Sequence, residues 1–303
     1  MNCKQWLNEW LTLYVKSTTK IRTYKKYQRQ IELHILHFLG EFELNELTAT
    51  VLQRFTVDLS EKGLSTNTVN GIITLLKTSL KRAVQVGVTE KEFSSAIVRP
   101  KPREKQVECF TKDEQKKIER YISEKKKPRL FGIILTLYTG LRIGELLALT
   151  WCDVDLKKGT LTVQKTCRDG WQSGKYIKVI ETPKTDCSMR VIPIPKQLFP
   201  HIKALKKKSK SNYVIEGKNE HGAGIRSYQN SFDLLLKRLK LPHKGFHSLR
   251  HTFATRALEC GMDIKTLSEI LGHKNPTITL KRYIHSMLEH KTEMMNRLGK
   301  LLE

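Results

Sequence analysis

The sequence predicts a mainly α-helical protein of two domains, the second of which holds a small antiparallel β-sheet. Three observations lead to this fold class. The chain has 303 residues, of which 39% are hydrophobic, and this length suits two domains better than one. Apolar side chains recur at helical spacings of three and four over most of the chain. Between residues 160 and 195 the pattern changes to short runs rich in Val, Ile and Thr, broken by Gly and Asp.

Four helices are expected in the first domain, residues 1–94. The second helix ends at Gly40 and has apolar residues at Tyr24, Tyr27, Ile31, Ile35 and Phe38. The third begins near Thr48 and ends at Gly63, and the fourth follows Ser65, a suitable N-cap, and ends near Gly87. Lysines lie opposite the apolar stripes, so the helices predict a small bundle suited to lie against DNA.

A basic interdomain linker is expected at residues 95–110. It contains Pro100 and Pro102 among several arginines and lysines. This composition disfavours packing and favours contact with a phosphate backbone.

The second domain, residues 111–303, is expected to begin at a capping box formed by Thr111 and Glu114. Helices continue through Leu149, and the stretches TLTVQKT, KYIKVI and RVIPIP then predict three strands of one antiparallel sheet. Helices resume near Pro195 and run to a final helix at about 286–303.

The charge of the chain indicates an anionic partner. There are 55 Lys and Arg against 30 Asp and Glu, a net charge of +25. Residues 1–105 hold 17 basic and 10 acidic residues, and residues 106–303 hold 38 and 20, so both domains are basic. Such a field favours nucleic acid or an anionic membrane, and the sequence has no lipidation motif or basic amphipathic anchor for a membrane.

No stretch approaches the roughly 20 apolar residues of a membrane span, and the N-terminus does not read as a signal peptide. A cytoplasmic protein is expected. The six cysteines are scattered without zinc spacing, so no metal site is predicted.

Two motifs in the second domain place basic residues on helices. TGLRIGE (139–145) ends one helix at Gly140 and puts Arg142 at the start of the next. A cation is unfavourable at a helix N-terminus unless an anion lies beside it, so Arg142 is either simply exposed or part of an anion site. FHSLRH (246–251) puts His247, Arg250 and His251 on one helical face, which in isolation is more typical of a polar surface stripe.

Three further motifs have ordinary structural interpretations when each is taken alone. TPKTD (182–186) lies in the turn between two expected strands, where Lys184 at a hairpin tip is usually solvated. LGHKN (271–275) follows a helix capped by Gly272, so His273 is expected in a loop. KRYIH (281–285) puts Tyr283 on an amphipathic helix, where a half-buried core tyrosine is usual.

Together, the five motifs and their order resemble the tyrosine recombinases, the lambda-integrase-like site-specific recombinases. The resemblance extends over nearly the whole chain, and the four-helix first domain looks like the family's core-binding (SAM-like) domain. Carried over by position, the catalytic set is Arg142, Lys184, His247, Arg250, His273 and Tyr283. All six residue types are present, and His251 is assigned a structural role instead.

The resemblance implies that Tyr283 attacks a phosphodiester of one DNA strand, leaving a 3′-phosphotyrosyl link and a free 5′-hydroxyl. Arg142 and Arg250 have planar donor sets that match the phosphate oxygens and stabilise the charge of the pentavalent transition state. His273 donates a further hydrogen bond to the phosphate.

Two proton transfers accompany this step. Lys184 resembles the general acid that protonates the leaving 5′-oxygen. A tyrosine hydroxyl has a pKa of about 10, so His247 is the expected base for Tyr283. Since the phosphotyrosyl bond keeps the energy of the phosphodiester, rejoining needs no ATP, and no cofactor is expected.

The sequence of the C-terminal half resembles most the sequences of integrases from phages and conjugative transposons, so integration or excision of a mobile element is the favoured function. The helices start almost at Met1, which leads us to expect no N-terminal arm-binding domain and keeps a Xer-like chromosome-dimer resolvase open. A type IB topoisomerase and a non-enzymatic DNA-binding regulator are the remaining alternatives.

The expected partners are double-stranded DNA with specific attachment sites and three further copies of the chain in a synaptic tetramer. Accessory DNA-bending or excision factors are compatible with this function. The final helix, with apolar residues from Met287 to Leu302, either packs on its own domain or docks on a neighbouring protomer.

Overall fold

The computed structural model describes residues 1–90, 94–102, 107–172, 175–182, 189–217, 222–273 and 275–283, and a few positions after residue 291. Its description does not extend to the side chains of residues 171, 172, 175, 176, 278 and 281–283. The chain forms two compact units, Met1–Lys105 and Gln106–Glu303. The boundary falls inside the stretch predicted as a linker. The fold class is confirmed as mainly helical with small antiparallel sheets.

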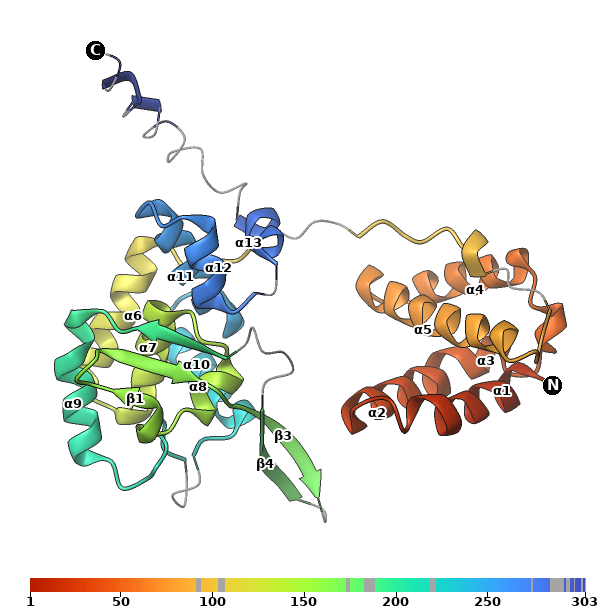
Figure 1. Cartoon of the computed structure of the whole chain (residues 1–303), viewed down its shortest axis with the longest axis horizontal. Coiled ribbons are helices and arrows are strands. Elements are labelled where there is room, and N and C mark those ends of the chain that lie inside the picture. The colour runs from red at the N-terminus through yellow and green to blue at the C-terminus, as the bar shows by residue number, and fades with distance from the viewer. Residues whose placement is uncertain are drawn as a thin grey trace. The chain divides into compact units, whose positions relative to one another are not determined.

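Unit 1 consists of helices (Figure 1). They are α1 (Cys3–Trp10), α2 (Ile21–Gln30), α3 (Leu36–Leu39), α4 (Ala49–Glu61) and α5 (Thr66–Gln85). π-Helical turns at Leu11–Val15 and Ile31–Ile35 extend α1 and join α2 to α3, so the chain forms the four helical rods expected from the sequence. Short 3-10 turns lie at Leu44–Glu46 and Ser94–Ala96.

The predicted helix boundaries in unit 1 are set by local hydrogen bonds and by glycine. The Thr48 hydroxyl accepts from the Val51 N–H at the start of α4, and the Ser65 hydroxyl accepts from the Thr68 N–H at the start of α5. After α4 the chain turns at Gly63, which has a φ of +72° that other residues rarely adopt. These caps depend on neighbours in sequence, which is why the sequence predicted them.

One apolar core holds unit 1 together. Residues at spacings of three and four from all of the long helices meet there, with Trp6, Phe55 and Ile72 fully buried. The predicted linker packs onto this unit in part, because the Val98 N–H donates to Gln53 (2.9 Å) and Asn70 Nδ2 donates to the Pro100 carbonyl (3.0 Å). Residues 98–100 are therefore attached to α4 and α5.

Unit 2 is a helical domain that carries two small sheets (Figure 1). Its helices are α6 (Lys112–Lys125), α7 (Phe131–Thr139), α8 (Ile143–Ala148), α9 (Phe199–Lys208), α10 (Ile225–Arg238), α11 (His247–Glu259), α12 (Ile264–Leu271) and α13 (Pro276–Tyr283). Its 3-10 turns lie at Pro128–Leu130, Trp151–Asp153 and Lys196–Leu198. The predicted capping box at the start of α6 is present, since Thr111 and Glu114 bond to each other's backbone N–H groups.

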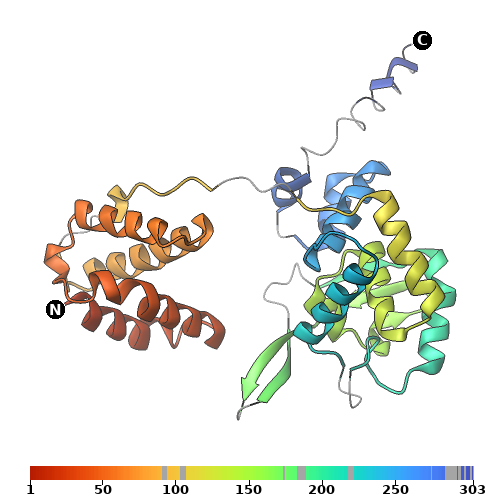
Figure 2. The same cartoon turned by 180° about the vertical axis from the view of Figure 1, so that it is seen from behind.

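The prediction of a single three-stranded sheet from the three stretches is wrong. The three-stranded sheet is β1 (Val154–Asp155), β2 (Thr160–Val163) and β5 (Arg190–Pro193), all antiparallel. The stretch KYIKVI lies instead in β4 (Lys175–Glu181), which pairs with β3 (Thr166–Gln172) as a separate two-stranded ribbon. Figure 2 shows this ribbon extending away from the body of unit 2.

Burial explains this division. In the three-stranded sheet, Leu161, Val163 and Ile192 face the core of the unit and are almost fully buried. In the two-stranded ribbon, by contrast, Ile177 and Ile180 are exposed. Both arrangements have alternating side chains, so periodicity alone did not separate them.

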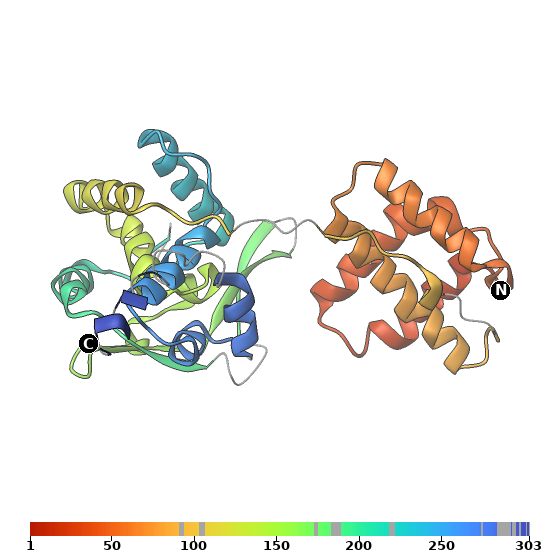
Figure 3. The same ribbon diagram turned by 90° about the horizontal axis from the view of Figure 1, so that it is seen from above.

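The core of unit 2 is centred on α7, which is apolar on all sides and buried along almost its whole length. Figure 3 shows α6 (yellow) and α10 (teal) at the same edge of unit 2, and Arg238 Nη1 at the end of α10 donates to the Tyr121 hydroxyl of α6 at 2.9 Å. Among the described helices of the chain, none is both long and apolar enough to cross a membrane.

Candidate active site at the end of α12

Arg142 lies at the predicted position between two helices. Gly140 ends α7 in the left-handed conformation, with a φ of +66°, and Arg142 is the N-cap of α8. The anion beside it belongs to the chain itself, because Glu145 bonds to the Arg142 N–H at 2.9 Å and to Arg142 Nη1 at 2.7 Å. The carboxylate removes the electrostatic conflict between a cation and a helix N-terminus.

Arg250 and His247 both lie on α11, as predicted, but in different surroundings. Arg250 is only 2% exposed, and its guanidinium donates to the carbonyls of Gly140 (2.8 Å) and Leu271 (2.6 Å). His247 begins the helix and is exposed, with its ring edge-on to that of His251 at 4.6 Å between centroids.

His273 follows α12 directly, where Gly272 ends the helix with a φ of +62°. Its Nδ1 lies 2.7 Å from the buried Thr279 hydroxyl, and its Nε2 lies 3.0 Å from Arg250 Nη2. An arginine can only donate, so Nε2 accepts from Arg250 and Nδ1 carries the proton in this arrangement.

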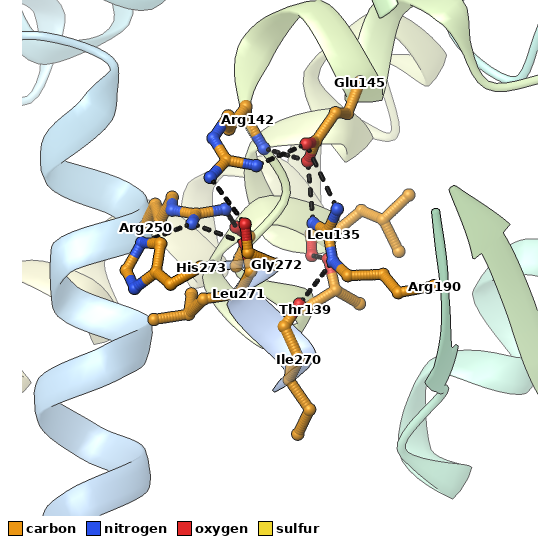
Figure 4. A network of polar contacts seen from close by, with 11 residues as sticks. Leu135, Thr139, Arg142, Glu145, Arg190, Arg250, Ile270, Leu271, Gly272 and His273 are labelled. Atoms are coloured by element: carbon orange, nitrogen blue, oxygen red, sulfur yellow. Dashed lines mark hydrogen bonds and ion pairs between the residues drawn. The ribbon is translucent and has the colours of Figure 1, made fainter. Parts of the chain in front are cut away.

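The structure brings Arg142, Arg250 and His273 together at the C-terminal end of α12 (Figure 4). Arg142 Nη2 donates to the Gly272 carbonyl at 3.2 Å, next to the Leu271 carbonyl that Arg250 holds. Residues from three separate elements therefore converge on one helix end.

Lys184 and the Tyr283 side chain lie outside the described part of the chain. Tyr283 is the last residue of α13, which packs against α12. Lys184 was expected at a hairpin tip between paired strands, and this expectation is wrong for the flanking strands, because β4 pairs with β3 and β5 pairs with β2. The segment that carries Lys184 joins two different sheets.

Two charged residues of the cluster were missed from the sequence, Glu145 and Arg190. Arg190 begins β5 and is 6% exposed, and its Nη2 lies 2.7 Å from Glu145 Oε2. Glu145 had a local signal, since it stands three residues after the N-cap, the position of an N-terminal capping acid. Arg190 had none, because its contacts join residues far apart in the chain.

Glu145 is ionised in this setting. Its burial opposes ionisation, but the hydrogen bonds and charge of Arg190, and then the charge of Arg142, outweigh burial and lower the pKa of the carboxyl to about 2. The cluster holds three guanidinium groups, and two of them, those of Arg142 and Arg190, contact this one carboxylate, while that of Arg250 bonds to the Leu271 carbonyl. The cluster therefore has a surplus of positive charge. An anion such as a phosphodiester is the ligand that this surplus favours.

Comparison with known proteins decides the family. The model of the phage integrase family matches residues 108–290, and that of the N-terminal SAM-like domain of phage integrases matches residues 3–60. The chain belongs to the phage integrase family. It is a tyrosine recombinase, an enzyme of site-specific DNA cleavage and rejoining, as its sequence motifs predicted.

The relatives of this chain include proteins named as tyrosine recombinases and proteins named as integrases. A protein of Caldanaerobacter subterraneus subsp. tengcongensis named "Tyrosine recombinase XerC-like" is 31% identical, over 97% of this chain and 82% of its own length. The ICEBs1 integrase of Bacillus subtilis is 27% identical, over 96% of this chain and 82% of its own length.

Solved integrase structures share the fold. The Tn1549 transposon integrase in complex with a circular intermediate DNA matches with a TM-score of 0.83 and 24% identity, over 98% of this chain and 99% of that chain. A lambda integrase tetramer bound to a Holliday junction matches with a TM-score of 0.69 and 20% identity, over 91% and 79%.

Proposed function

We propose that this recombinase integrates and excises a mobile genetic element, and that Tyr283 is its nucleophile. The tyrosine oxygen attacks the phosphorus of one strand, the bond to the 5′-oxygen breaks, and a 3′-phosphotyrosyl link forms. Lys184 gives a proton to the departing 5′-oxygen, and His247 takes the proton of Tyr283. Rejoining is the reverse attack by a 5′-hydroxyl, so no external energy source enters.

The observation that carries this proposal is the convergence of Arg142, Arg250 and His273 on the end of α12. A phosphate bound there meets guanidinium donors from two separate elements, α8 and α11, as a charged transition state requires. In the DNA-free arrangement His273 Nε2 accepts from Arg250. Donation to a phosphate therefore requires a proton on Nε2 and an Arg250 donor turned towards the same anion.

A mobile element is favoured as the substrate because the ICEBs1 integrase and the Tn1549 transposon integrase are among the proteins similar to this chain. The XerC-like relative supports the second candidate, chromosome-dimer resolution. The DNA that is cut decides between them: ends of the adjacent element for an integrase, a chromosomal site for a resolvase. Either substrate is cellular DNA, which favours a cytoplasmic location.

The active assembly is proposed to be a tetramer on DNA, linked through the last segment of the chain. The lambda integrase is a tetramer on its Holliday junction. The segment 286–303 lies outside the described residues except at isolated positions, of which Met295, Leu298 and Leu302 are exposed apolar residues. Removal of residues 290–303 should leave binding to a single site intact and abolish cooperative complex formation, measured by gel shift over a range of protein concentration.

Covalent trapping tests the nucleophile. The protein is incubated with nicked DNA that carries the ends of the adjacent element, and the products are separated under denaturing conditions. The wild type should give a covalent protein–DNA band that maps to Tyr283 by peptide digestion. Tyr283→Phe should give none while its DNA affinity changes by less than about twofold, because only the attacking oxygen is lost.

Tyr213→Phe is the matched control for trapping. Tyr213 lies in the same unit, and the centroid of its ring is 3.7 Å from Lys178 Nζ. A phenylalanine ring preserves this contact. It should trap DNA like the wild type. A covalent band from Tyr283→Phe, or a band of the wild type that maps to another residue, would refute the assignment of the nucleophile.

A further inference from the structure

Three successive carbonyl groups at the end of α12 each accept a hydrogen bond from a different arginine (Figure 4). Arg190 Nε donates to the Ile270 carbonyl at 2.5 Å, Arg250 Nη2 to that of Leu271 at 2.6 Å, and Arg142 Nη2 to that of Gly272 at 3.2 Å. The last carbonyls of a helix lack partners within the helix and carry its negative partial charge. The arginines therefore satisfy this helix end, and the helix end in turn fixes the arginines.

Arg190 differs from the other two arginines in how its donors are used. Its Nη1 and Nη2 lie 3.1 Å and 2.7 Å from the two oxygens of Glu145, while its Nε holds Ile270. The Arg190 side chain is only 6% exposed, and if it turned towards a ligand the buried Glu145 carboxylate would lose this partner. The Arg142 side chain, by contrast, is 36% exposed.

Glu145 connects the two arginines, since its Oε1 also accepts from Arg142 Nη1 at 2.7 Å. If Arg142 were its one cationic partner, this buried carboxylate would compete with a DNA phosphate for the same guanidinium. Arg190 supplies a second cation, so that Glu145 orients Arg142 without neutralising it.

The turn after α12 is built around Arg190. A Cβ atom added at Gly272 would lie 3.0 Å from Arg190 Nη1 and 3.3 Å from its Cζ. Only glycine allows the guanidinium to lie this close to the turn that begins at Gly272 and carries His273, and its φ of +62° also favours glycine.

We propose that Arg190 is a positioning residue of the recombination site. It holds Arg142 (through Glu145) and the turn that carries His273 in fixed positions relative to each other before DNA binds. This inference rests on the proposed function, because the groups that it positions are those proposed to bind the phosphate. Arg190 is the first residue of β5, the strand that follows Lys184 in the sequence.

Single-turnover cleavage of nicked DNA at saturating concentration, measured beside DNA affinity, tests the proposal. Arg190→Gln should lower the cleavage rate by about 10²-fold, the size of effect that a small misplacement of reacting groups produces. DNA affinity should change by less than about threefold, since the Arg190 side chain is only 6% exposed and its donors are held by Glu145 and Ile270. Arg190→Lys keeps the charge but offers one nitrogen in place of three and should restore only part of the rate.

A double-mutant cycle separates positioning through Glu145 from a general loss of structure. In a chain that already carries Glu145→Gln, adding Arg190→Gln should lower the cleavage rate by clearly less than about 10²-fold, because the connection through Glu145 is already broken and only the contact with the turn after α12 is left to lose. Effects that multiply independently would overturn the proposal. Arg168→Gln is the matched control: Arg168 also forms a 2.7 Å ion pair with a glutamate, Glu181, but on the β3–β4 ribbon away from α12, and its cleavage rate should match the wild type.

A measurement without DNA keeps this proposal distinct from the proposed function. In the wild-type protein labelled with nitrogen-15 arginine, NMR should show slow solvent exchange of the Arg142 and Arg250 side-chain N–H groups. Arg190→Gln should accelerate the exchange of Arg142 by about tenfold or more, whether or not the protein traps DNA. Unchanged exchange at Arg142 would overturn the positioning role, even if covalent trapping at Tyr283 succeeds.

Discussion

Two ion pairs of the same length, 2.7 Å, lie in the two units of the molecule, and burial separates them. In unit 2, Arg190 and Glu145 are 6% and 5% exposed, while in unit 1, Lys62 and Asp58 are 47% and 28% exposed. An ion pair between exposed charges adds little to stability because water screens it. A buried charge that loses its partner lowers the stability strongly, because the charge then lies in the interior without compensation. A distance alone therefore says little about what an ion pair contributes.

The wider polar content of the two units follows the same division. Among the described residues of unit 1, the buried polar side chains are uncharged: Thr56, Ser79, Thr89 and Ser94. Unit 2 buries Glu145, Asp153 and Arg250. Unit 1 is thus stabilised by an apolar core with its basic groups at the surface, whereas in unit 2 the buried Glu145 and Arg250 orient groups around α12.

The largest effect expected from this comparison is that of Arg190→Met. The substitution leaves Glu145 buried with one cation fewer and removes the donor to Ile270, so it should destabilise unit 2 by about 3–5 kcal/mol. Hydrogen exchange of peptides from α8 and α12 measures this loss, and peptides from unit 1 serve as the internal reference. Arg190→Met combined with Glu145→Met should recover part of the loss, and a cost below about 1 kcal/mol for Arg190→Met alone would contradict the comparison.

A pH titration gives the next largest effect. The pKa of Glu145 is about 2 in the folded chain against an ordinary value of 4.5, so the unfolded chain binds its proton first as the pH falls. The stability from Glu145 is complete above about pH 4.5 and is lost progressively as the pH falls towards 2. The full difference corresponds to about 3 kcal/mol.

Glu145→Gln provides the control for this titration. The difference in unfolding free energy between the wild type and Glu145→Gln should be constant above about pH 5 and should shrink below pH 4.5, as measured by denaturant unfolding at each pH. A difference that stays constant down to the lowest pH at which both proteins fold would show that Glu145 is not held ionised by its arginines.

How far the sequence predicted the molecule depends on how far apart the interacting residues are. The helix starts at Thr48, Ser65 and Thr111 and the glycine turn at Gly272 depend on neighbours in the sequence, so each was predicted correctly from a few residues. The pairing of the strands involves residues distant in sequence, and there the single sheet was wrong. Alternation fixes which side chains share a face but not which strand lies beside which.

The same distinction applies to the candidate site. Sequence motifs identified Arg142, Arg250 and His273, and in the structure the three residues lie at one helix end. Arg190 bonds to residues 45 and 80 positions away, and such contacts leave no periodicity in the sequence. Its part in the site could be recognised only after the chain had folded.

The smallest effect concerns the ion pair that can be read from the sequence, Asp58 and Lys62 at helical spacing i,i+4. Lys62→Met removes the charge and keeps most of the stem, so it matches Arg190→Met. It should lower the stability of unit 1 by less than about 0.5 kcal/mol, and about 1 M salt should erase the difference, because water and ions already screen this pair. Hydrogen exchange of α4 peptides measures it. A loss of 1 kcal/mol or more would mean that pairing, and not burial, sets how much these contacts stabilise the protein. The ion pairs of Arg190 and Lys62 would then not differ because of their burial.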